Sequence, residues 1–197
     1  MIRNSHTRRF STTAVALTAM VFVAACSSED PSVTSGGSNT ALSASELQDA
    51  SGRELVEELE RLPLAERPTN FVASVETEAV VMIDEEGNES SVPLPEDEFY
   101  LSVAPYVDET HECFFHSLTT CVGEMREEEL EVTVVEEATG EVLVNQTVQT
   151  HNNGFFGLWL PRDIDAELTI EHDGLTSTAP ISTGEGDPTC LTTLQLA

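Results

Sequence analysis

The stretch Leu130–Thr150, LEVTVVEEATGEVLVNQTVQT, has the pattern of a β-hairpin. In its first half Leu130, Val132 and Val134 alternate with polar residues, and a strand turns alternate side chains to opposite faces. The Ala-Thr-Gly segment at 138–140 supplies a turn, because glycine accepts the positive φ that tight turns need. The stretch therefore predicts two antiparallel strands with one face on a core and the other in water.

Further strand-like segments lie on both sides of this hairpin. They are rich in apolar and β-branched residues, and turn residues such as Gly87-Asn88 and Asp173-Gly174 separate them. The predicted strands cover residues 71–75, 79–83, 99–103, 155–160, 166–171, 175–181 and 190–196. This spacing predicts a mainly β fold, an antiparallel β-sandwich or barrel domain preceded by a short N-terminal helical segment.

The helical segment precedes the first predicted strand. Leu55, Leu59 and Leu62 recur at i, i+4 and i+7, which is the period of one helix face. Ser51 and Glu54 have the spacing of a capping box at its start. A helix this short needs a partner that covers its leucine face. The sequence leaves two partners open, the domain that follows or a second copy of the protein in a homodimer.

The first residues have the composition of an export signal. A basic start without acidic residues is followed by the apolar run Ala14–Ala25, which is too short to span a membrane as a helix. Val23-Ala24-Ala25-Cys26 resembles the lipobox of bacterial lipoproteins, in which the cysteine is lipidated. We therefore expect a lipid anchor on Cys26 and a location in the cell envelope, at the outer face of the cytoplasmic membrane or in the periplasm. The alternative is an ordinary cleaved signal with a chance cysteine.

Composition divides the chain into four segments. Residues 1–25 form the lipoprotein signal peptide, and residues 26–44, rich in serine, glycine and threonine, form a flexible tether. Residues 45–68 form the helical segment. Residues 69–197 form the β-rich domain, which carries the cysteines considered below.

The charge balance excludes one class of partner and favours another. The chain has 36 acidic and 8 basic residues, all of the basic ones arginine, for a formal net charge of −28. Nucleic acid is not expected as a partner, because its binding depends on cationic contacts to phosphates. An acidic surface attracts cations and keeps an exported protein soluble. It should also raise the pKa of cysteine thiols, so that metal binding weakens at low pH.

The densest group of metal-binding side chains is the stretch His111–Cys121, HECFFHSLTTC. It holds two of the four cysteines and two of the five histidines, the side chains that best bind soft and borderline metals. In one straight strand the sulfurs of Cys113 and Cys121 would lie roughly 26 Å apart, at about 3.3 Å per residue. A joint role therefore requires the chain to fold back, and Ser117 and Thr119-Thr120 are the expected places.

The run Cys113–Glu124, CFFHSLTTCVGE, followed much later by the DPTC of Asp187–Cys190, resembles the signature of the CueP family, exported copper-binding proteins of bacteria. Similarity continues through Arg61–Leu64, Leu101–Tyr106 and Gly157–Pro161. The resemblance implies a protein that binds copper in the cell envelope. It would serve copper buffering, copper resistance or delivery of copper to a client protein.

Cysteine pairing stays open on the residues alone. With Cys26 lipidated, Cys113, Cys121 and Cys190 remain, an odd number in an oxidising compartment, so at least one thiol lacks an intramolecular partner. A structural bridge between Cys113 and Cys121 with Cys190 spare is as well supported as a metal site. The resemblance favours a metal site.

Cys190 starts the last predicted strand. It shares a parity with Leu194 and Leu196, so its side chain should point to the core face. If Cys190 meets Cys113 and Cys121, with help from His116, the thiolates select Cu(I) or Zn(II) over hard ions. Counting ligands suits zinc equally well, and the resemblance implies Cu(I). The sequence leaves open whether His111 is also a ligand.

We predict a non-enzyme. The sequence has no Gly-x-Ser-x-Gly, no His-Glu-x-x-His, no phosphate loop and no Cys-x-x-Cys. Two alternatives to a copper-binding protein stay open: a thiol redox protein that cycles its cysteines, and a β-sandwich interaction module with one structural disulfide.

Overall fold

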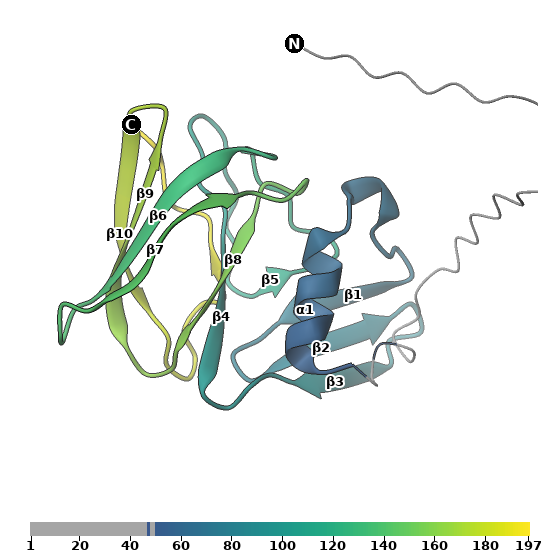
Figure 1. Cartoon of the computed structure of the whole chain (residues 1–197). Coiled ribbons are helices and arrows are strands. Elements are labelled where there is room, and N and C mark those ends of the chain that lie inside the picture. The colour runs from purple at the N-terminus through teal and green to yellow at the C-terminus, as the bar shows by residue number, and fades with distance from the viewer. Residues whose placement is uncertain (1–46, 48–49) are drawn as a thin grey trace, which may run out of the picture. The chain divides into compact units, whose positions relative to one another are not determined.

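The computed structural model describes Leu47 and residues 50–197 (Figure 1). The segments expected to be a signal peptide and a tether, and Cys26, where lipidation is expected, lie outside the described residues. Within the described part the chain is mainly β with one α-helix, as the sequence predicted. None of the helices described there has the length and apolar character needed to span a bilayer.

The first core lies between a helix and a sheet (Figure 1). Helix α1 begins after Ser51, which forms the predicted capping box with Glu54 in both directions. Its leucine face packs on a four-stranded antiparallel sheet of the same chain, in the order β3-β2-β1-β5. The partner of the helix is therefore the domain that follows. The elements are α1 (Gly52–Arg61), the 3-10 turn η2 (Leu64–Glu66), β1 (Phe71–Val75), β2 (Ala79–Asp84), β3 (Glu89–Pro93) and β5 (His116–Ser117).

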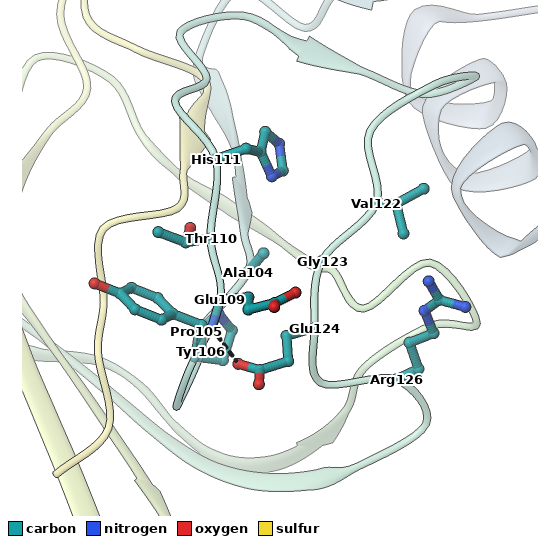
Figure 2. A pocket seen from close by; sticks show the side chains of 10 residues that line it. All are labelled: Ala104, Pro105, Tyr106, Glu109, Thr110, His111, Val122, Gly123, Glu124 and Arg126. Atoms are coloured by element: carbon teal, nitrogen blue, oxygen red, sulfur yellow. Dashed lines mark hydrogen bonds between the residues drawn. The ribbon is translucent and has the colours of Figure 1, made fainter.

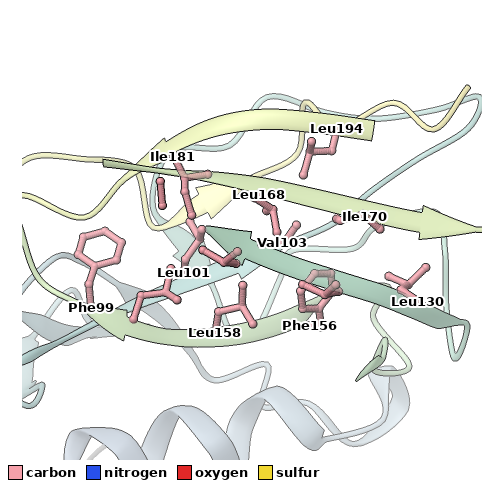
Figure 3. Packing of buried hydrophobic residues seen from close by; sticks show 14 of the residues in the cluster. Phe99, Leu101, Val103, Leu130, Phe156, Leu158, Leu168, Ile170, Ile181 and Leu194 are labelled. Carbon is pink, nitrogen blue, oxygen red and sulfur yellow. The ribbon is translucent and has the colours of Figure 1, made fainter. Parts of the chain in front are cut away.

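The second core lies between two further sheets, which form a β-sandwich. One sheet has the order β10-β9-β6-β7 and the other the order β11-β4-β8. Figure 3 shows side chains from both sheets, among them Leu101, Leu158 and Leu168, pointing toward one another. The elements are β4 (Glu98–Val103), β6 (Glu129–Glu136), β7 (Val142–Gln149), β8 (Phe156–Pro161), β9 (Asp165–His172), β10 (Leu175–Ser182) and β11 (Cys190–Leu191).

Strand β4 is shared by the two cores. Phe99, Leu101 and Val103 point into the sandwich, whereas Tyr100 points into the core beneath α1. Tyr100 stacks there at a tilt on Trp159 of the neighbouring strand β8, with ring centroids 4.8 Å apart. Because both faces of β4 are covered, the helix–sheet core and the sandwich form adjoining layers, and the cysteine motif follows at their junction.

The last predicted strand is shorter in the structure than in the prediction. Only Cys190 and Leu191 pair with β4, in parallel, and one further bridge joins Gln195 to Tyr106. All three predicted inward residues are buried, but Leu194 and Leu196 lie in the sandwich core, whereas Cys190 packs with Ala104 and Phe155 in a separate small cluster. The alternation of side chains predicted for one continuous strand therefore does not hold across the break after Leu191.

Candidate metal centre

The cysteine motif folds back at the predicted place. The hydroxyl of Ser117 accepts a hydrogen bond from the backbone N–H of Thr120 at 3.2 Å, and the N–H of Cys121 donates to the Ser117 carbonyl at 3.1 Å. The short strand β5, immediately before this turn, is anchored on β1. As a result the sulfurs of Cys113 and Cys121 lie 3.6 Å apart.

Cys190 reaches the same point from the other sheet. Its N–H donates to the carbonyl of Phe114 at 3.1 Å, and the N–H of His116 donates to the hydroxyl of Thr189 at 3.1 Å. Strand β11 is thereby tied to the segment that enters β5. The structure therefore brings Cys113, Cys121 and Cys190 together, although 77 residues separate the first from the last.

The pairing of these cysteines differs from the one that the sequence left open. Cys113 and Cys190 form a disulfide with their Cα atoms 5.6 Å apart, and Cys121 is the free cysteine among the described residues. The alternative of a Cys113–Cys121 bridge with Cys190 spare is therefore wrong for this structure. The reason is the backbone hydrogen bond from Cys190 of β11 to Phe114, which places Cys190 beside Cys113. The spacing of cysteines along the sequence does not reveal this contact.

His116 is a buried donor beside these sulfurs. Its side chain has no exposed surface, and its Nδ1 lies 3.8 Å from the Cys190 sulfur. The ligand atoms of His116, Cys121 and Cys190 all lie within 4.8 Å of one another. Two ligands that are each about 2.3 Å from one ion are at most about 4.6 Å apart. The spacing of these three groups therefore fits a metal ion after small adjustments.

A chain of hydrogen bonds fixes the orientation of the His116 ring. The N–H of Phe155 donates to Oδ1 of Asn153 at 3.0 Å, so the amide nitrogen of Asn153 faces Glu60 and donates to its Oε1 at 2.9 Å. The other carboxylate oxygen, Oε2, lies 2.9 Å from Nε2 of His116. Since a carboxylate accepts, Nε2 carries the proton. Nδ1 faces the sulfurs, where it could bind a metal ion once it has lost its own proton, as in the carboxylate–histidine–metal arrangement.

The electrostatics around Cys121 are opposite to those expected from composition. Burial by itself would lower the pKa of His116, but the Glu60 carboxylate and the Cys121 sulfur together raise it to about 9. Burial would raise the pKa of Cys121, and the hydrogen bond and charge of His116 outweigh it and lower that pKa. The buried Arg67 adds a positive charge, and its Nη1 donates to the Cys121 carbonyl at 2.9 Å. The local cations therefore favour the thiolate of Cys121.

His111 lies on the outer side of the cluster. Its ligand atom lies within 4.8 Å of the sulfurs of both Cys113 and Cys121. Its imidazole lines a surface pocket of about 590 Å³. Figure 2 shows it there together with the carboxylates of Glu109 and Glu124. Glu124 accepts hydrogen bonds from backbone amides of the loop that carries Glu109. His151 and His172 belong to neither group of metal-binding side chains found in the described residues.

Sequence analysis missed Glu60 and Asn153. A signal for Glu60 exists, because it follows Val56 by four positions and so lies on the buried face of α1. A carboxylate on an apolar helix face is buried only with partners. No comparable signal marks Asn153, which looks like an ordinary turn residue before Gly154.

Three sulfurs and a buried imidazole, gathered where two β-rich cores adjoin, place the chain in the class of candidate binders of soft metal ions. The sequence model of the family described as "Periplasmic copper-binding protein CueP" matches residues 54–195. A solved structure described as "Crystal Structure of S.CueP" is similar with a TM-score of 0.68 and 35% sequence identity, over 75% of this chain and 90% of that one. No curated protein matches the chain. The chain belongs to the CueP family of periplasmic copper-binding proteins, as its motif predicted.

Proposed function

We propose that the protein is a lipid-anchored member of this family that holds Cu(I) on the thiolates of Cys113, Cys121 and Cys190, with His116 as a further donor. It would buffer copper in the envelope or pass it to a client protein. The observation that supports this most is the meeting of three sulfurs from two distant segments beside a buried, oriented imidazole.

The metal-binding form requires reduction of the disulfide. A thiol reductant would break the Cys113–Cys190 bond and supply two electrons and two protons, which leaves three thiols in the cluster. Metal binding then displaces the thiol protons and, because the pKa of His116 is about 9, the Nδ1 proton of His116 as well. The loss of the Cys121 proton is favoured because, against the effect of burial, the hydrogen bond and charge of His116 lower the pKa of this thiol.

Copper is favoured over zinc by family membership rather than by ligand counting. Three cysteines and His116 would also complete a tetrahedral zinc site. Cu(I) is satisfied by two or three of the sulfurs, which suits a cargo that must be released again.

A competition titration tests the thiolate site. Reduced protein is titrated anaerobically against a coloured Cu(I) chelator, for the wild type and for Cys121→Ser. Loss of an outer-shell partner alone weakens metal binding by about 10–100-fold, so loss of this thiolate should cost at least about 100-fold. The matched control is Cys26→Ser, which removes a sulfur outside the cluster and should bind like the wild type. Equal copper retention by Cys121→Ser and the wild type would overturn the proposal.

The same control variant tests the anchor. Cell fractionation should recover the wild type with membranes and Cys26→Ser in the soluble periplasmic fraction. A wild-type protein found only in the soluble fraction would refute lipidation without touching the copper site.

A thiol redox function is the second candidate. It is favoured by the free Cys121 sulfur 3.6 Å from a sulfur of the Cys113–Cys190 disulfide, a suitable separation for thiol–disulfide exchange. Counting free thiols in the anaerobically purified protein separates the candidates, since a resting copper-binding form needs three in the cluster.

A further inference from the structure

Two overlapping sets of donors share the cluster. The inner set is His116, Cys121 and Cys190, and the outer set is His111, Cys113 and Cys121. Within each set all ligand atoms lie within 4.8 Å of one another, and the sulfur of Cys121 belongs to both. An ion held in either set could therefore reach the other without releasing Cys121.

The two sets differ in their access to water. In the inner set His116 and Cys190 are buried, whereas none of the three side chains of the outer set is buried. The imidazole of His111 lines the surface pocket beside Glu109 and Glu124 (Figure 2). Arg126 also lines the pocket, and the two carboxylates against its one guanidinium leave a formal charge of about −1, which favours an incoming cation.

The two histidines also differ in what occupies their nitrogens. Nε2 of His116 donates a hydrogen bond to the carboxylate of Glu60. Within residues 50–197 no hydrogen bond or ion pair engages the ring nitrogens of His111, whose recorded side-chain contact is an edge-on one with Phe155 at 6.2 Å between centroids. The buried Phe155 ring also contacts His116, at 4.6 Å. The ring of Phe155 thus contacts both imidazoles.

We propose that the outer set is a second metal position, through which Cu(I) is loaded and released. This rests on the proposed copper function and adds a route to it. Cu(I) first binds His111, Cys113 and Cys121. It then moves inward as its bond to His111 breaks and bonds to Cys190 and His116 form, while Cys113 and Cys121 stay bound. The Nδ1 proton of His116 passes to the released imidazole of His111 and the proton of the Cys190 thiol passes to solvent water, and no electron is exchanged.

The route explains how a buried ion becomes available to a client. Two thiolates hold copper throughout, while one imidazole replaces the other and a third thiolate joins, so copper never has to exist as a free ion. Release runs in reverse, and a client would take copper from the exposed outer set. Removing His111 should therefore slow loading and release equally and leave the resting affinity unchanged.

Stopped-flow transfer experiments test this on the reduced full chain under anaerobic conditions. Cu(I) bound to bathocuproine disulfonate is the donor for loading, and excess of the same chelator is the acceptor for release. For His111→Ala both rates should fall about tenfold while the equilibrium affinity changes less than about threefold. For His116→Ala the affinity itself should fall. His172→Ala, which removes an imidazole outside both sets, is the matched control and should behave like the wild type.

Each other outcome contradicts the route. Wild-type rates in His111→Ala would show that loading bypasses the outer set. A loss of affinity as large as that of His116→Ala would make His111 a resident ligand of one single site. Failure of the wild type to retain Cu(I) is a separate result, which would overturn the proposed function itself and the route with it.

Discussion

The imidazole of His116 is held by hydrogen bonds in series that begin at a backbone amide. The N–H of Phe155 fixes Asn153, and Asn153 and His116 each give one hydrogen bond to Glu60. Both carboxylate oxygens are therefore acceptors. A glutamine in this place has only one acceptor oxygen, and its amide nitrogen would face a donor on the other side.

Glu60→Gln should consequently weaken Cu(I) binding by about 10–100-fold, the usual effect of losing an outer-shell partner. The measurement is chelator competition on the reduced protein. Glu58→Gln, an exposed position on the same helix, is the control and should leave the affinity unchanged. Wild-type affinity in Glu60→Gln would show that Glu60 does not position the ring.

At the scale of elements, two glycines in contact join the segment that follows Cys121 to the turn that carries Asn153. Gly154 has φ +83°, and a Cβ there would lie 2.6 Å from the carbonyl oxygen of Gly123. The N–H of Gly123 also donates to the carbonyl of Asn153 at 2.6 Å. The segment that leaves Cys121 is thereby locked onto the turn that carries Asn153.

Gly154→Ala should destabilise the protein through both strain and overlap. The matched control is Gly174→Ala, which has the same φ of +83° with open space around it. The left-handed conformation alone costs an alanine about 1–2 kcal/mol, which is the loss expected for Gly174→Ala. Gly154→Ala should lose about 1–3 kcal/mol more, because of overpacking. Urea unfolding measures both, and equal losses would mean that the Gly123 contact relaxes without cost.

Elements with a local pattern were predictable from the sequence, and the others were not. The hairpin β6–β7 was predicted from the alternation that begins at Leu130, because a half-buried strand shows its period directly. Strand β3 was not predicted, although the turn before it was. Val92 is its one buried side chain, opposite Val80 on β2, so its sequence has no period to detect.

At the scale of the whole described chain, the candidate centre combines parts that are distant in sequence. Glu60 comes from α1, His116 from β5, Asn153 from the turn before β8, and Cys190 from β11. The motif around Cys113, together with the DPTC of Asp187–Cys190, predicted all three sulfurs and one imidazole of the cluster through the family resemblance. Which strands adjoin is set by packing of the two cores, and strand periodicity carries no information about it.

The Cys113–Cys190 disulfide joins these two cores. Cys113 leads into β5 of the sheet beneath α1, and Cys190 begins β11 beside β4 of the sandwich. Closing a loop of this length removes entropy from the unfolded chain, an effect of about 4.5 kcal/mol in the chain-entropy model. Reduction should therefore lower the melting temperature. The melting temperature of Cys113→Ser should be low from the start and should not change when reductant is added.

Cu(I) should then replace the disulfide as the link between the cores. An ion bound by thiolates from both sheets binds the folded chain more tightly than the unfolded one, so it stabilises that state by up to about 2.7 kcal/mol at a free concentration 100 times the dissociation constant. Thermal unfolding of the oxidised, reduced and reduced Cu(I)-loaded protein measures this, with loading expected to recover much of the lost melting temperature. In Cys113→Ser the recovery should be smaller, because one of the thiolates is missing. Reduced wild type that melts at the same temperature with and without Cu(I) would show that copper does not link the two cores.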